Sequence, residues 1–473
     1  MSNGSSTQRV LADLRRQAAA GRPGDPLPST RALVARHGVG PVTVSRAIAR
    51  LAAEGVLVSE PGRGTYVAPP RTGRADPPDL GWQTVALADR TVAADDLVEL
   101  LAPAEAGALV LATGYLDAEL QPTRLLADAL ARAARRPGAW HRPPLSGVPE
   151  LRAALAAPTG VDPADVLVVP GGQAGMSAAL RGLVPPGSAV AVESPTYLGV
   201  LVTARAAGLR PVPVPVDGEG LRPDLLAEAI GRCGARLVYC QPAYANPTGT
   251  VMPATRRAEI LEVVREAGAF LLEDDYARWL GIDGAPPPPM VCDDPDGHVV
   301  HLSSLTKATA PSMRIGALVA RGPAAARLRA QRVVDDFFVP APMQEAAVEL
   351  LAAAGWRRHL TALHRALATR RDALLAAVAP FGTVSRVPGG GLHLWTRLPD
   401  GVDDVEVAAR AARRGLRVSA GTPYFAGEPP APYLRLSYAA EPPERLVAGA
   451  RLLGDIVGNI VADLAGPAGR IGP

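Results

Sequence analysis

The sequence of 473 residues predicts an α/β protein with a separate, mainly helical N-terminal domain. Three observations lead to this prediction. Residues 1–68 show the pattern of three helices and a β-hairpin, and residues 69–100 are rich in Pro, Gly, Arg and Asp without a sustained apolar period. From about residue 101 onwards, strands alternate with helices. We therefore expect two domains, 1–68 and 101–473, joined by a linker.

The composition excludes several classes of protein. Hydrophobic residues make up 48% of the chain and charged residues 20%, which suits large buried cores and not a disordered chain. No run of about 18 apolar residues is free of charge, and the first twenty residues lack an apolar signal core, so neither a membrane span nor secretion is expected. The three cysteines form no CxxC pair, which fits a reducing cytoplasm and predicts no metal site.

The first domain is predicted from apolar spacing and from residues that begin and end helices. Ser29 is placed to cap one helix, and Gly38 to end it. In the next helix, Val44, Ala47 and Ile48 recur with helical spacing and form a buried stripe with Leu51. Three helices and a hairpin of this length predict a winged helix-turn-helix. The helices are expected at 7–20, 30–37 and 41–54, and the strands at 56–59 and 65–67.

Charge suggests what this domain binds. Residues 1–74 contain eleven Arg and four acidic residues, a net charge of +7, whereas the whole chain carries +3. A basic N-terminal domain joined to a mildly acidic second domain is typical of nucleic-acid binding. We expect the third helix to lie in the major groove of DNA and the hairpin to form the wing. A helical module that binds another protein would pack in the same way and is the alternative. The candidate DNA-binding residues are Arg31, Thr43, Ser45, Arg46, Arg50 and Arg63.

The basic residues of the chain are very unevenly divided between Arg and Lys. Of 49 basic residues, 48 are Arg, and Lys307 is the single Lys. Arg keeps the charge and the hydrogen bonds of Lys, but it does not supply a primary amine that can lose its proton. Lys307 is therefore expected where an amine is chemically required, as in Schiff-base formation, with chance survival as the alternative.

Polar motifs follow the predicted strands of the second domain. A glycine turn and a helix start follow the first strand, and this arrangement favours phosphate. Asn246, Asp274 and Lys307 each come shortly after a later strand. Because ligands collect at the carboxyl ends of such strands, these side chains are expected to share one site. The strands are expected at 166–170, 189–192, 237–240, 269–272 and 299–302, followed by a smaller subdomain at about 340–473 with a helix near 343–378 and strands at 391–396 and 433–437.

These side chains are the parts that a pyridoxal phosphate site needs. Lys307 would react with the aldehyde, and Asp274 would pair with the pyridine nitrogen. Arg435 would bind the carboxylate of an amino acid. Each motif read alone has a structural explanation, such as a turn or a surface ion pair. The other candidates are Asn246 and Tyr276 at the phenolic oxygen, Tyr197 on the ring face, and Gly172, Gln173, Ser304 and Arg314 at the phosphate.

Two stretches of the chain resemble known families. The segment from Pro28 to Val67 closely resembles the GntR family of bacterial regulators. Residues 101–460, which carry Asn246, Asp274, Tyr276, Lys307, Arg314 and Arg435, resemble the class I/II aminotransferases of PLP fold type I. A GntR-like winged helix joined to an aminotransferase-like domain resembles the architecture of the MocR subfamily.

The resemblance implies a cytoplasmic, homodimeric transcription regulator. It would bind duplex promoter DNA and sense an amino acid, an amine or PLP through a Schiff base on Lys307. Two other readings stay open: an active aminotransferase of an amino acid with an accessory DNA-binding module, and a regulator whose second domain only dimerises. The retention of Lys307 argues against the second of these.

Overall fold

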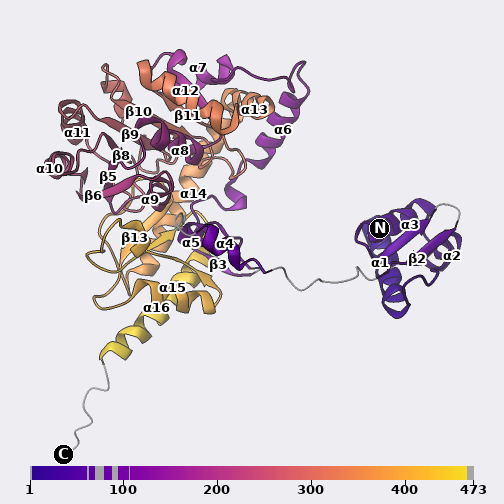
Figure 1. Ribbon diagram of the computed structural model, residues 1–473. Helices are drawn as coiled ribbons and strands as arrows, with labels where there is room; N and C mark the ends of the chain where they lie inside the picture. Colours follow the sequence, from indigo (N-terminus) through magenta and orange to yellow (C-terminus); the bar gives the residue numbers. More distant parts are fainter. Residues whose placement is uncertain (1–2, 61–62, 70–78, 88–93, 106, 466–473) are drawn as a thin grey trace, which may run out of the picture. The chain divides into compact units, whose positions relative to one another are not determined.

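A computed structural model describes residues 3–60, 63–69, 79–87, 94–105 and 107–465 (Figure 1). The chain forms two compact units, Met1–Thr91 and Val92–Pro473. Within the described ranges, no helix is both long enough and apolar enough to cross a membrane.

The first unit has the predicted winged helix-turn-helix elements. Ser29 caps the second helix, because its Oγ accepts a hydrogen bond from the Ala32 amide over 3.3 Å. Gly38 ends this helix with a φ of 63°, a conformation that glycine adopts without strain. The first helix begins earlier than predicted, at Asn3. The elements are α1 (Asn3–Ala20), α2 (Thr30–His37), α3 (Pro41–Ala53), β1 (Leu57–Glu60) and β2 (Gly64–Val67).

A single small core holds these elements together. The predicted stripe Val44, Ala47, Ile48 and Leu51 of α3 is buried against apolar residues of α1, α2 and both strands. β1 and β2 pair antiparallel, with Leu57 opposite Val67. Because this stripe is buried, the remaining side chains of α3 point outward, and the polar face of this helix is available to a partner.

The range predicted as a linker contains two short helices. α4 (Gly81–Ala86) lies in the first unit, and α5 (Asp95–Leu101) lies in the second, where it contacts α9 (Leu198–Ala206). Residues 70–78 and 88–93 lie outside the described residues.

The second unit is built on a mainly parallel sheet, as predicted. Among the described residues, eight strands pair in the order β4-β11-β10-β9-β8-β5-β6-β7, and the pairs from β10 to β6 are parallel. β9 and β10 run a few residues further than predicted, so Asp274 and Ser304 end up inside the strands. The strands are β4 (Val166–Val169), β5 (Ala189–Ser194), β6 (Arg210–Asp217), β7 (Gly220–Leu221), β8 (Leu237–Cys240), β9 (Phe270–Asp275), β10 (Val299–Ser304) and β11 (Gly316–Val319).

Helices cover both faces of this sheet, and successive strand residues point to opposite cores. Leu271 packs with α7, α10 and α11 on one face, and the next residue, Leu272, packs with α8, α9 and α12 on the other. Because the sheet is buried on both faces, the positions of the strand ends are fixed. The polar residues at the carboxyl ends of the strands are held in place with them. The helices are α6 (Thr123–Ala134), α7 (Pro149–Ala156), α8 (Gly172–Leu183), α10 (Pro223–Cys233), α11 (Ala254–Glu266), α12 (Gly322–Asp336) and α13 (Ala341–Ala352).

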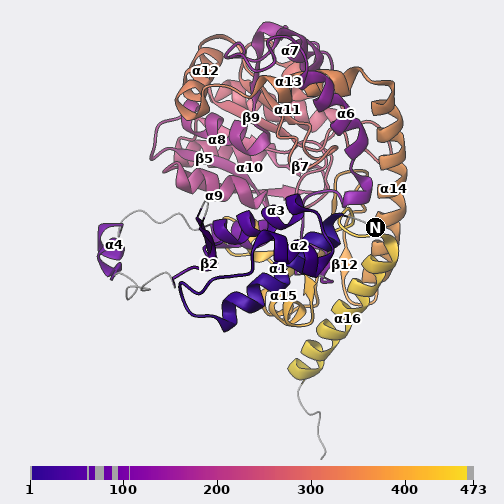
Figure 2. The ribbon, with the colours of Figure 1, turned by 90° about the vertical axis from the view of Figure 1, so that its right-hand side faces the viewer.

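The smaller subdomain has a four-stranded antiparallel sheet in the described residues, in the order β12-β13-β16-β15. It also includes a segment from the start of the unit, because β3 (Leu109–Val110) pairs with β14 (Leu416–Arg417). In Figure 2, α14 and α16 both lie along one edge of the unit, and the two helices pack against each other. The remaining elements are β12 (Thr383–Val384), β13 (His393–Arg397), β15 (Ser419–Ala420), β16 (Tyr433–Ser437), α14 (Ala354–Val378), α15 (Asp404–Arg413) and α16 (Pro443–Ala465).

The single long helix expected near 343–378 is a wrong prediction. Two helices, α13 and α14, meet at Ala353, whose ψ of 133° is extended and breaks the helical hydrogen bonds. Apolar spacing continues through the break, which is why the sequence pattern did not reveal it. Short 3₁₀ helices occur at Ala118–Leu120, Pro163–Asp165, Met290–Asp293 and Thr422–Tyr424.

Candidate functional site

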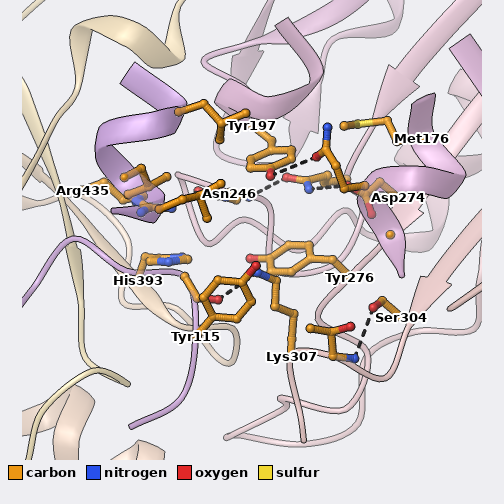
Figure 3. A pocket seen from close by; sticks show the side chains of 18 of the residues that line it. Tyr115, Met176, Tyr197, Asn246, Asp274, Tyr276, Ser304, Lys307, His393 and Arg435 are labelled. Atoms are coloured by element: carbon orange, nitrogen blue, oxygen red, sulfur yellow. Dashed lines mark hydrogen bonds between the residues drawn. The ribbon is translucent and has the colours of Figure 1, made fainter. Parts of the chain in front are cut away.

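A cavity opens at the carboxyl ends of the central strands and is closed on its other side by the smaller subdomain (Figure 3). Its volume is about 790 Å³ including the mouth. All the residues predicted for cofactor and effector binding line it: Gly172, Gln173, Tyr197, Asn246, Asp274, Tyr276, Ser304, Lys307, Arg314 and Arg435.

One end of the cavity is suited to an anion. α8 begins at Gly172, so the free amides of its first turn point towards the cavity. Gly171 has a φ of 84°, and a Cβ built there would lie 2.7 Å from Cζ of Arg314. A glycine is therefore required if the guanidinium is to lie against this turn. Ser304 completes the set, since a Cβ on Gly172 would lie 3.7 Å from its Cβ.

Asp274 is buried and held by two donors from the neighbouring strand segment. Its Oδ2 accepts hydrogen bonds from the Tyr239 hydroxyl over 2.6 Å and from Gln241 Nε2 over 2.8 Å. Burial raises the pKa of Asp274, while the two hydrogen bonds act in the opposite direction. Because Tyr239 and Gln241 are two residues apart, the alternation of the strand brings both to the same face.

Lys307 follows β10 and reaches into the cavity. Its Nζ donates to the Gly114 carbonyl oxygen over 2.9 Å and lies 4.0 Å from the centre of the Tyr115 ring. Burial lowers the pKa of Lys307 to about 7, helped by the positive charges of Arg435 and Arg314. A large fraction of the side chain is thus an uncharged amine near neutral pH, which is the form that attacks a carbonyl carbon.

Arg435, on β16, is buried with 1% of its surface exposed. Its Nη1 donates to Asn246 Oδ1 over 3.4 Å, its Nη2 donates to the Ala112 carbonyl, and its Nε has no partner. Among the described residues, no carboxylate lies within ion-pair distance of this guanidinium. A buried cation without an acid is suited to pairing with the carboxylate of a ligand.

The remaining polar side chains hold each other in place. The Tyr276 hydroxyl donates to the Tyr244 carbonyl oxygen over 2.8 Å, and the Tyr197 hydroxyl donates to Gln173 Oε1 over 3.4 Å. Burial raises the pKa of both phenols, so they stay protonated donors.

These residues fit pyridoxal phosphate. The glycine turn with Ser304 and Arg314 suits a phosphate, the carboxylate of Asp274 suits a protonated ring nitrogen, and Lys307 supplies the amine. Thr306 adds a buried hydroxyl on the cavity wall that has no hydrogen-bond partner. When bound, this cofactor supplies an aldehyde and an electron-withdrawing ring.

Comparison with known proteins identifies a family for each of the two units. Residues 6–67 match the family of bacterial regulatory proteins called gntR, and residues 108–451 match aminotransferase class I and II. The HTH-type transcriptional regulator TauR of Rhodobacter capsulatus is 30% identical over 85% of this chain and 86% of its own length. The probable rhizopine catabolism regulatory protein MocR of Rhizobium meliloti is 29% identical over 89% and 87%.

The chain belongs to the MocR subfamily of GntR-type transcription regulators. As a member of this MocR subfamily it is a DNA-binding regulator, and its cofactor is pyridoxal phosphate. The second unit has the fold of the aminotransferases. The solved structure of LysN, the α-aminoadipate aminotransferase of Thermus thermophilus, is 29% identical with a TM-score of 0.72 over 80% of this chain and 97% of that one.

In this MocR-subfamily chain, the residues predicted to contact DNA lie on the outside of the first unit. Ser45 and Arg46 are exposed on α3, Arg31 is exposed on α2, and Thr43 is half-buried. Two of the candidates have acidic partners: Arg50 bonds Glu54 over 3.2 Å, and Arg63 bonds Glu60 over 3.3 Å. Arg46 has no ion-pair partner among the described residues, so its guanidinium is available to DNA.

Several cavity residues were not predicted from the sequence. Gln241 lines the cavity, and Tyr239 bonds Asp274 without lining it. Both could have been found, because polar residues alternate there at the end of an otherwise apolar strand. Gly114 and Tyr115 had no such signal, because they come from an irregular segment next to β3. The other unpredicted lining residues are Leu97, Leu100, Leu101, Met176, Thr306 and His393.

Proposed function

We propose that the second unit senses a small molecule in the cofactor cavity, and that this binding changes how strongly the first unit binds duplex promoter DNA. The candidate ligands are an amino acid, an amine or pyridoxal phosphate itself. The observation that carries the proposal is the guanidinium of Arg435, which is buried without an acid partner in the same cavity as Lys307. The protein would act in the cytoplasm, where bacterial DNA lies.

Each cavity residue has a role in this proposal. Lys307 attaches the cofactor covalently through its neutral amine, and Asp274 holds the proton of the ring nitrogen. Asn246 and Tyr276 bind the phenolic oxygen, and Tyr197 packs on the ring. Arg435 then binds the carboxylate of the ligand, and in doing so pulls on Asn246, to which it is hydrogen-bonded. The phosphate is held by Gly172, Gln173, Ser304 and Arg314.

The proposal includes a homodimer. Exposed aromatic side chains on the second unit support it, since Trp140 is 78% exposed and Phe337 is 65% exposed. Apolar surface of this kind is typical of a subunit interface. Sedimentation equilibrium measures the mass directly, and a monomer at micromolar concentration would contradict this part of the proposal.

Transamination of an amino acid is a second candidate function. It is favoured by one observation: the side chains that attach and hold the cofactor all line one cavity. Formation of a 2-oxo acid from the sensed amino acid, at more than one molecule per protein chain, would establish it. Binding of the amino acid with no turnover supports the regulator alone.

The test is a DNA titration of wild type, Arg435→Ala and Arg435→Lys, with and without each candidate ligand at saturation. Coupling between ligand and DNA is typically worth about 1–3 kcal/mol, or roughly 5-fold to 150-fold in affinity. We expect Arg435→Ala to lose the response to an amino acid, and Arg435→Lys, which keeps the charge, to lose less. Borohydride reduction should still place the cofactor on Lys307 in both variants. An undiminished response in Arg435→Ala would show that no carboxylate is bound there.

A further inference from the structure

His393 is a buried polar residue of the cavity with one ring nitrogen unused. It is the first residue of β13, lies opposite Ser437 of β16, and has 5% of its surface exposed. Its imidazole is hydrogen-bonded to the backbone of Thr113, whereas Nε2 has no partner. In Figure 3 the ring lies beside Arg435 and points towards Tyr115 and the end of Lys307.

The free nitrogen of His393 and the amine of Lys307 face the same point. A Cβ built on Gly114 would lie 3.8 Å from His393 Nε2 and 3.6 Å from Lys307 Nζ. The absence of a side chain at Gly114 leaves this space open to a ligand. Nε2 is therefore aimed into the part of the cavity where the reactive amine lies.

The surroundings of His393 determine which hydrogen-bonding role this nitrogen can play. Burial lowers the pKa of the imidazole well below its usual value, and the positive charges of Arg435 and Lys307 lower it further. The ring is therefore neutral and carries one proton. Its bond to Thr113 favours the protonated form of the ring, so the ring is the donor there, through Nδ1. Nε2 then holds a lone pair and can only accept.

We propose that His393 is a ligand-binding residue whose Nε2 accepts a hydrogen bond from the amino group of a molecule held at its carboxylate by Arg435. The cavity then recognises the head group of an amino acid at both ends, and disfavours plain carboxylic acids and plain amines. This inference rests on the proposed function and selects the amino acid among its three ligand classes.

A purely structural role does not explain this residue. A buried acceptor without a partner costs free energy, and a leucine or phenylalanine would fill the same space without that cost. The residues on either side of His393 in the chain are apolar, with Leu392 and Leu394 both buried. A polar ring is thus retained at the one point of the strand that faces the cavity.

The test uses two probes and does not require the natural ligand. One is N-(5′-phosphopyridoxyl)-leucine, the compound bound in the LysN structure, which joins a cofactor ring, a secondary amine and a carboxylate. The other is the same molecule with an ether oxygen in place of the amine. Calorimetry gives the affinity of each for the full-length, cofactor-free chain and for His393→Phe and His393→Gln. His364→Phe is the matched control, because this half-buried imidazole bonds the Trp279 carbonyl outside the cavity.

Wild type and His364→Phe should bind the amine probe more tightly than the ether probe, by roughly tenfold or more, the usual effect of one hydrogen bond to a charged donor. His393→Phe should bring the ratio of the two affinities close to one, and His393→Gln, which keeps an acceptor, should restore part of it. The same ratio in wild type and His393→Phe would overturn the inference, even if both bind. Failure of both probes to bind wild type would also overturn it, whereas failure of Lys307 to attach the cofactor contradicts the proposed function alone.

Discussion

The hydroxyl of Tyr239 donates a hydrogen bond to Oδ2 of Asp274 over 2.6 Å, and both side chains are buried. This bond stabilises the ionised form of the carboxylate that we propose pairs with the cofactor ring. We expect Tyr239→Phe to raise the pKa of Asp274 further and to weaken cofactor binding, with a cost of about 1–3 kcal/mol. Equilibrium binding of pyridoxal phosphate measures the loss.

A second buried tyrosine provides the control for this variant. The Tyr438 hydroxyl donates to the Gly390 carbonyl oxygen over 3.0 Å, away from the cavity lining. Tyr438→Phe should lower the melting temperature as much as Tyr239→Phe does, but should leave the cofactor affinity unchanged. Equal losses of cofactor affinity in the two variants would show that Tyr239 acts only through stability.

Attachment of the cofactor to Lys307 should depend on pH around neutrality. The pKa of Lys307 is lowered to about 7, so the amine is neutral and reactive above this pH and protonated below it. We therefore expect the rate of attachment to rise with pH and to level off above about 8. Arg435→Ala removes a positive charge and should move the midpoint upward, while Arg435→Lys should not. Stopped-flow absorbance between pH 5 and pH 9 would measure this; a midpoint near 10 would contradict it.

Alanine substitutions at two glycines with nearly the same φ distinguish backbone strain from crowding of the added Cβ against Arg314. Gly171 has a φ of 84° and Gly187 a φ of 86°, but a Cβ at Gly187 meets nothing within 4 Å. Both alanine variants should lose about 1–2 kcal/mol of unfolding free energy through backbone strain. Only Gly171→Ala should also displace Arg314 and weaken binding of inorganic phosphate or the cofactor. Equal phosphate affinity in both variants would show that Arg314 does not contribute to the anion site.

DNA binding should depend differently on two arginines of the first unit, Arg46 and Arg63. Arg46 is exposed without an acid partner among the described residues, so Arg46→Ala should cost about 1–3 kcal/mol at one base position of the operator. Arg63, which forms an ion pair with Glu60, should contribute a smaller part of the DNA-binding free energy. This contribution should be independent of sequence and should decrease with salt. Fluorescence anisotropy with an operator series at several salt concentrations tests both. Equal binding of promoter and random duplex would contradict sequence-specific recognition.

Much of this structure follows from local patterns in the sequence. The stripe from Val44 to Leu51, the cap at Ser29 and most of the strand that carries Asp274 are set by neighbours in the chain, and all three were predicted. The candidate residues at strand ends met in one cavity because parallel strands share a carboxyl edge.

The rest depends on contacts between distant segments. His393 and Arg435 reach the cavity only because the smaller subdomain folds over the sheet, and Gly114 enters it through the pairing of β3 with β14. No local periodicity encodes these contacts. The break at Ala353 was missed for the same reason, since the apolar spacing on both sides of it is helical.

Because this chain has a single lysine, cleavage by a lysine-specific protease can report when the second unit opens. An endoproteinase that cleaves after lysine has one target in the whole sequence, the bond between Lys307 and Ala308. Ala308 is 1% exposed, so the bond becomes a substrate only when the second unit opens. In the cofactor-free protein, the rate at which two fragments form therefore measures this opening without any label. The cofactor should slow cleavage in two ways, by stabilising the closed form and by occupying the Lys307 amine that the protease recognises.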